Sequence, residues 1–82
     1  MKNVTEAYWE AYKGINIKEN EQMVLESKSI AFCYYFARDV KDSNKEELFK
    51  VVLESGNKDL INIFLQYVEF DKKKFKNYLL FI

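Results

Sequence analysis

Residues 24–27 read VLES, and residues 52–55 read VLES again, 28 positions later. The flanking residues agree at the same offset, so the recurrence extends well beyond four letters. The matched pairs are Tyr8 with Phe36, Tyr12 with Val40, Lys13 with Lys41, Asn16 with Asn44, Phe36 with Phe64, and Val40 with Val68. After a one-residue deletion, Leu48 pairs with Phe75. This pattern predicts three units, at approximately 1–27, 28–55 and 56–82, within a single domain spanning residues 1–82.

The composition favours helices over strands. The chain has 82 residues with no proline and 2 glycines, whereas the turns of a β-sandwich or β-barrel use both residues often. Its hydrophobic fraction of 49% is high enough to build a core, which excludes a disordered chain. We therefore predict a small all-α, helical-repeat (α-solenoid-like) stack of about three helical hairpins, with about five to six helices.

Each unit is predicted to contain an apolar first helix, a polar turn and a more amphipathic second helix. In the middle unit we expect these helices at about 29–40 and 45–54. Asn44 suits the N-cap of the second helix, because its side chain can accept a backbone N–H and Glu47 can bond back. Asn16 and Glu19 have the same spacing, which predicts the same cap in the first unit.

Apolar residues recur at helical spacing and predict the core. The expected inward stripes are Val4, Tyr8, Ala11 and Tyr12 in the first unit, Phe32, Cys33, Phe36, Ala37 and Val40 in the second, and Leu60, Ile61, Phe64, Leu65 and Val68 in the third. Gly14 and Gly56 follow predicted helices and suit left-handed C-terminal caps.

The third unit departs from the pattern. Lys72, Lys73 and Lys74 would place three positive charges at the positive end of a helix dipole. Either these lysines have another role or no helix begins there. Because neither glycine nor proline occurs after Gly56, one long helix through residues 57–82 is an alternative.

Residues 36–57, FARDVKDSNKEELFKVVLESGN, resemble a short two-helix repeat of bacterial and phage proteins whose consensus reads approximately FARDVKGANIEKLEDVVIESGD. The first unit matches at residues 13–17 and at VLES, and the third only at Phe64 and Val68. The resemblance implies a helical-repeat scaffold that acts as a binding surface. It brings no catalytic residues with it.

Residue types needed for most catalytic chemistry are missing. The chain has no histidine and one cysteine, Cys33, so no metal-ligand spacing and no internal disulfide exist. Two isolated glycines cannot form a phosphate-binding loop. Cys33 lies on the most apolar predicted helix and reads as a small buried hydrophobe. We expect a protein that is not an enzyme and that has no cofactor.

Several aromatic and basic residues are candidates for contact with a partner. Trp9 is turned roughly 100° from the inward stripe of its helix, and off-stripe tryptophans serve either as interface anchors or as end caps of a stack. The other candidates are Tyr34 and Tyr35, the lysines Lys72, Lys73, Lys74 and Lys76, and Phe81, which points away from the apolar face of the last predicted helix.

The function indicated is protein binding, with three alternatives for the partner. A chain this short and rich in Lys, Asn and Ile is typical of AT-rich phages and other mobile elements, whose small proteins often inhibit a host defence complex. We therefore favour an anti-CRISPR-like inhibitor whose partner is a CRISPR-associated effector. The alternatives are RNA or other nucleic acid, contacted through the basic-aromatic segment 72–76, and a homodimer through the C-terminal helix. A single cysteine and no membrane-spanning run predict a cytoplasmic protein without a membrane partner, in the host cytoplasm if phage-encoded.

Overall fold

A computed structural model describes residues 2–76. Its helices are α1 (Val4–Tyr12), α2 (Ile17–Ser27), α3 (Ile30–Asp39), α4 (Lys45–Ser55) and α5 (Lys58–Tyr67), followed by the short 3₁₀ helix η1 (Lys73–Phe75). No strand occurs within residues 2–76. The predicted all-α class and the count of five helices are confirmed.

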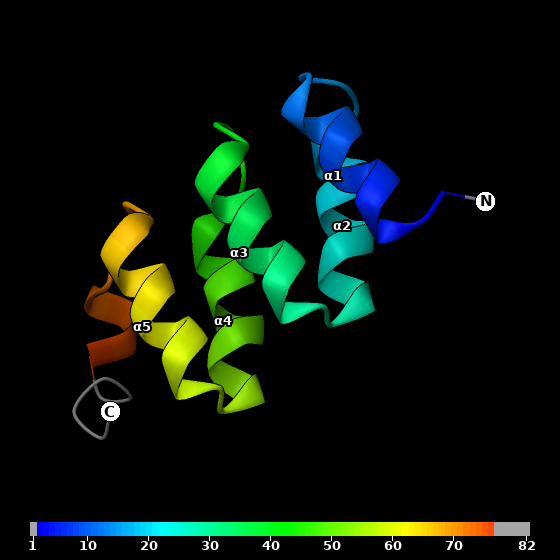
Figure 1. Cartoon of the computed structure of the whole chain (residues 1–82). Coiled ribbons are helices and arrows are strands. Elements are labelled where there is room, and N and C mark those ends of the chain that lie inside the picture. The colour runs from blue at the N-terminus through cyan, green and yellow to red at the C-terminus, as the bar shows by residue number, and fades with distance from the viewer. Residues whose placement is uncertain (1, 77–82) are drawn as a thin grey trace.

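The helices form two layers of consecutive antiparallel pairs (Figure 1). The first helices α1, α3 and α5 lie side by side, and α2 and α4 form the second layer. In Figure 1 the pairs follow one another from the N-terminus at the right to η1 at the left, and the molecule measures 39 × 20 × 16 Å. Each pair therefore buries one side on the next, while each layer keeps an outer face.

The serine of each VLES segment joins one helical pair to the next. Ser27 Oγ donates to the Val24 carbonyl oxygen at 2.6 Å and accepts the Ser29 backbone N–H at 3.2 Å. Ser55 makes the same two bonds, to the Val52 carbonyl oxygen and from the Asn57 N–H, at 2.5 and 3.2 Å. The recurring segment thus ends a second helix and begins the following first helix.

Two of the predicted caps are confirmed and one is wrong. Asn44 Oδ1 accepts the Glu47 N–H at 3.2 Å, and Gly56 ends α4 with φ of 74°. Asn16 makes no side-chain cap bond, because its own backbone is left-handed with φ of 46°. Lys28 occupies the position equivalent to Gly56 and is left-handed as well, with φ of 58°, a conformation strained for a residue with a Cβ.

Most of the predicted stripes form one continuous core. The fully buried large side chains are Val24, Phe36, Val40, Leu48, Phe49, Val52 and Phe64. Phe49 stacks among Phe64, Phe70 and Phe75 with ring centroids 4.9–5.1 Å apart, which ties α4 to the C-terminal part of the described chain. Phe32, Leu60 and Leu65 are partly buried and pack on the edge of this core.

The predicted alignment of the first unit is wrong on α1. The second helices α2 and α4 begin 28 residues apart, but α1 and α3 begin at Val4 and Ile30, 26 residues apart. The difference arises because α1 is one residue shorter than α3 and its loop to α2 is also one residue shorter. Ala7 is consequently buried, and Tyr12, which we expected to face inward, is 55% exposed.

The single long helix through the third unit is also wrong for the described residues. α5 ends at Tyr67, and Val68 takes an extended conformation with φ of −112°. The Lys72 side chain folds back and donates to the Leu65 carbonyl oxygen at 2.9 Å, near the end of α5. The expected face of Phe75, Tyr78, Leu79 and Ile82 lies outside the described residues except for Phe75, which is buried. No described helix is long and apolar enough to cross a membrane.

Candidate functional site

An exposed apolar surface runs across the layer of first helices. Counted from the starts of α1, α3 and α5, Trp9, Tyr35 and Ile63 occupy the same helical position, and they are 53%, 38% and 38% exposed. Tyr12 and Arg38 share a second exposed position one turn further on, and Tyr67 follows at the end of α5. We call these six residues the first-helix surface.

Aromatic contacts hold the α1 end of this surface in place. Tyr8, which is nearly buried, meets the Trp9 ring edge-to-face with centroids 5.1 Å apart, and it lies 6.4 Å from Tyr35 on the neighbouring helix. Trp9 and Tyr12 are themselves edge-to-face at 5.8 Å. Edge-to-face pairs are favourable for aromatic rings, so this part of the surface is ordered before any partner arrives.

Arg38 is fixed in the middle of the first-helix surface. Its Nε and Nη2 atoms each donate to a different carboxylate oxygen of Asp39 at 2.8 Å. The guanidinium carbon lies 5.1 Å from the Tyr34 ring centroid and 5.2 Å from that of Tyr35, within cation–π distance. A bidentate, ring-stacked guanidinium is held rigid and still presents further N–H donors to a partner.

The Asp39 carboxylate also accepts a hydrogen bond from the Tyr8 hydroxyl. Hydrogen bonds from Arg38 lower the pKa of the Asp39 carboxyl, and the Tyr8 hydroxyl adds to this. Burial, followed by the bond to Asp39, raises the pKa of Tyr8 from 10.0 to about 12. Tyr8 therefore stays a neutral donor, and Asp39 stays an ionised acceptor, across the physiological range.

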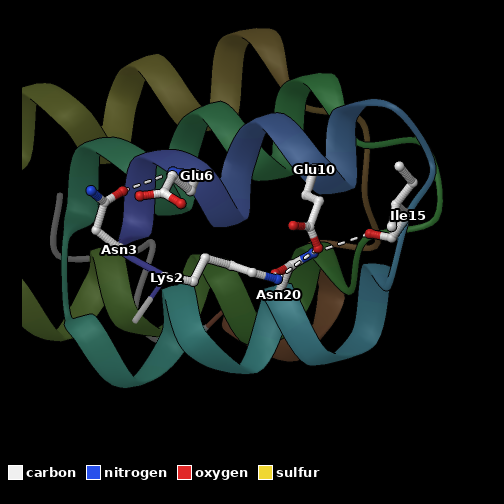
Figure 2. Close-up of polar contacts among 6 residues, drawn as sticks. All are labelled: Lys2, Asn3, Glu6, Glu10, Ile15 and Asn20. Carbon is white, nitrogen blue, oxygen red and sulfur yellow. Dashed lines mark hydrogen bonds and ion pairs between the residues drawn. The ribbon is translucent and has the colours of Figure 1, made fainter.

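A polar network closes the N-terminal end of the stack beneath α1 (Figure 2). Lys2 Nζ donates to Glu10 Oε1 at 2.6 Å and to Asn20 Oδ1 at 2.8 Å, and Asn20 Nδ2 donates to the Ile15 carbonyl oxygen at 3.0 Å. Figure 2 shows the Lys2 side chain reaching across from the start of α1 to α2. The bond from Lys2, ahead of that from Asn20, lowers the pKa of Glu10.

This network stands where the other units have apolar core. By the offsets of the helix starts, Glu10 occupies the position of Phe36, and the buried Asn20 occupies that of Leu48. The polar end therefore satisfies the chain's own groups and positions α1, and with it Trp9 and Tyr12. It acts as a support for the first-helix surface.

The structure separates the predicted contact residues. Trp9 and Tyr35 lie on the first-helix surface, whereas Tyr34 is only 7% exposed and packs between Arg38 and Phe64 as a support. Phe81 lies outside the described residues. The prediction for Trp9 therefore places the side chain correctly outward, while the role of each residue in binding stays a prediction.

The four predicted lysines are exposed, but two of them are engaged within the chain. Lys72 bonds the end of α5 and lies 5.7 Å from the Phe70 ring centroid. Lys74 pairs with Glu46 on α4 at 2.7 Å. Phe75, the aromatic residue between Lys74 and Lys76, is 4% exposed and stacks on Phe49, so it cannot stack on a base.

Within residues 2–76, no cluster of three or more His, Cys, Asp or Glu side chains has the arrangement of a metal site. Cys33 is fully buried, and burial raises the pKa of its thiol to about 11, so it is almost entirely protonated near neutral pH. This environment fits the predicted role of Cys33 as a packing residue.

Sequence reasoning missed Tyr12, Arg38, Ile63 and Tyr67 as members of the surface. The signal that could have found them is the helical position shared by Trp9, Tyr35 and Ile63, which appears only when α1 is aligned at 26 rather than 28 residues. Arg38 and Asp39 were visible in the FARDV segment but were matched to a consensus instead of to each other.

Comparison with known proteins yields no match: no protein-family model, no curated protein and no solved structure is detectably similar to this chain. The resemblance of residues 36–57 to the bacterial and phage repeat therefore stays a prediction.

Proposed function

We propose that the protein is a non-enzymatic protein-binding module whose partner docks on the first-helix surface. The observation that carries this proposal is the exposure of Trp9, Tyr35 and Ile63 at one helical position of three adjacent helices, beside a fixed Arg38. Tryptophan, tyrosine and arginine are the residues most enriched among interface hot spots. Preordered side chains also reduce the entropy lost on binding.

A protein partner suits this surface better than nucleic acid does. The Arg38 charge is already balanced by Asp39, and the chain carries 13 basic and 13 acidic residues, so phosphate gains little attraction. Segment 72–76 is the alternative nucleic-acid site, but its Phe75 is buried and its Lys74 is paired. A homodimer through the C-terminal residues is a further alternative, which concentration-dependent mass measurements would test.

For the biological role, we propose inhibition of a host defence complex, such as a CRISPR-associated effector, by occlusion of one of its surfaces. This scenario is supported by the small size of the chain and by the resemblance of residues 36–57 to repeats in phage proteins. It requires a single rigid contact surface, which the first-helix surface would supply.

The test is affinity capture with matched variants, followed by binding measurements on the captured protein. Trp9→Ala should weaken binding by about 2 kcal/mol or more if Trp9 is a hot spot, and Arg38→Ala should also weaken it. Lys18→Ala, an exposed change on α2, should leave binding unchanged. Binding that Trp9→Ala and Arg38→Ala leave intact would overturn the proposal.

A further inference from the structure

The second-helix layer contains a groove that the proposed function does not use. It lies between α2 and α4, with a volume of about 460 Å³. Its lining includes Gln22, Leu25 and Glu26 from α2, and Glu47, Val51 and Glu54 from α4. Leu25 and Val51 pack against the core and give the groove an apolar part, while the glutamates surround it with carboxylates.

The two helices that form the groove are acidic. Together α2 and α4 carry six carboxylates and three lysines. Two of those carboxylates already have partners, because Glu21 accepts the Asn44 N–H and Glu46 pairs with Lys74. Lys45 turns away from the groove toward the carbonyl oxygens of Val40 and Lys41. The groove therefore keeps an excess of negative charge, even though the whole chain is neutral.

Glu26 and Glu54 give this charge a regular placement. They are the glutamates of the two VLES segments, and they lie on opposite walls of the same groove. Neither forms an ion pair with a side chain of residues 2–76. The Lys50 ammonium inside the groove is 3.8 Å from Glu47 Oε1, which occupies the lysine on that wall.

The chain already makes one contact of the kind such a groove would accept. On the other side of α4, Phe75 inserts against Phe49 while the preceding Lys74 pairs with Glu46 at 2.7 Å. A smaller cavity of about 180 Å³ lies there, lined by Lys50, Leu53, Glu54 and Phe75. A lysine beside an apolar side chain is thus the chemistry that packs on the edge of this helix.

We infer that the α2–α4 groove binds a cationic segment of a partner protein. An apolar side chain of that segment packs on Leu25 and Val51, and lysines or arginines on either side of it pair with Glu26 and Glu54. Charge complementarity selects the segment, since a carboxylate-lined groove attracts basic and repels acidic peptides. The site lies in the opposite layer from the first-helix surface, so it stands or falls separately from the proposed function.

The test uses the full chain and a fluorescein-labelled peptide, KLKKLK, followed by fluorescence anisotropy. The double variant Glu26→Gln, Glu54→Gln should weaken binding about fivefold or more, the loss expected for two partly exposed ion pairs. The matched double variant Glu6→Gln, Asp59→Asn removes the same charge from exposed positions on α1 and α5 and should bind as the unaltered chain does. The peptide KGKKGK, without apolar side chains, should bind more weakly.

Three results would overturn the inference. KLKKLK might show no saturable binding; both double variants might weaken binding equally, which would indicate general charge attraction; or Trp9→Ala might abolish peptide binding, which would move the site to the first-helix surface. Retention of peptide binding by Trp9→Ala, together with loss in the glutamate variant alone, supports the groove. That outcome is independent of whether capture through the first-helix surface succeeds.

Discussion

The Tyr8 hydroxyl on α1 donates a hydrogen bond to the carboxylate of Asp39 at the end of α3, and Arg38 binds the same carboxylate. This link crosses between two helical pairs directly beneath the exposed rings of Trp9 and Tyr35. The aromatic end of the first-helix surface and its guanidinium are therefore held by one acceptor. A change at that acceptor should affect both stability and the geometry of the surface.

Tyr8→Phe removes the interhelical donor but keeps the ring. We expect the free energy of unfolding to fall by about 0.5–1.5 kcal/mol, the contribution of one hydrogen bond. The raised pKa of Tyr8, about 12 against an ordinary 10.0, implies stability that is complete below pH 10 and lost as the pH rises through 12. Urea unfolding should therefore show less loss between pH 10 and 12 in Tyr8→Phe than in the unaltered chain. Equal alkaline loss in both would contradict the link.

Acid should destabilise the N-terminal end of the stack. The pKa values of Glu10 and Asp39 are lowered from ordinary values of 4.5 and 3.8, so their stabilisation is present above those values and is lost as the pH falls below them. Glu10→Gln should make the urea midpoint less dependent on pH between 5 and 2. A variant with the same pH dependence as the unaltered chain would show that the network with Lys2 contributes nothing.

Exchange at the two equivalent left-handed caps should have opposite effects. Lys28→Gly places glycine at φ of 58° and should stabilise the chain by about 0.5–1 kcal/mol, since the left-handed conformation is strained for lysine. Gly56→Ala should cost about 1 kcal/mol through the same strain, because no atom lies within 4 Å of the added Cβ to cause a clash. Thermal unfolding measures both, and a destabilised Lys28→Gly would show that the lysine side chain has a role of its own.

The two VLES serines should be equivalent in energy. Ser27→Ala and Ser55→Ala each remove a bond to a helix-end carbonyl and one from the next helix's first residues. Each variant should lose about 0.5–1.5 kcal/mol, and the losses should agree within roughly 0.5 kcal/mol. A large difference between the two would argue that the second copy of VLES is a coincidence of sequence.

The second unit was predictable because local chemistry decides its structure. Asn44 caps α4 and Gly56 ends it, and each effect depends on neighbours in the sequence. α1 was not, because its shorter helix and shorter loop are absorbed before Asn16 and leave the later matches unchanged. The end of α5 depends on Lys72 folding back to Leu65, a contact that no helical pattern contains.

The candidate surface was predictable only in part, for a related reason. Trp9 stands out in the sequence because it leaves the inward stripe of its helix. Tyr34 and Tyr35 are adjacent and look alike in the sequence, yet one is buried and the other exposed, since Tyr34 faces Phe64 of the next pair. Which of two neighbouring aromatics remains outside depends on tertiary packing.

Photo-crosslinking tests the central claim most directly. A benzophenone amino acid would replace Tyr35, which is exposed at the centre of the first-helix surface, and in a matched variant would replace Lys18 on α2. On irradiation in host lysate, the Tyr35 position should yield one discrete crosslinked protein that Trp9→Ala removes, and the Lys18 position should not yield it. Equal crosslinking from both positions, or a Tyr35 product that survives Trp9→Ala, would contradict binding through this surface.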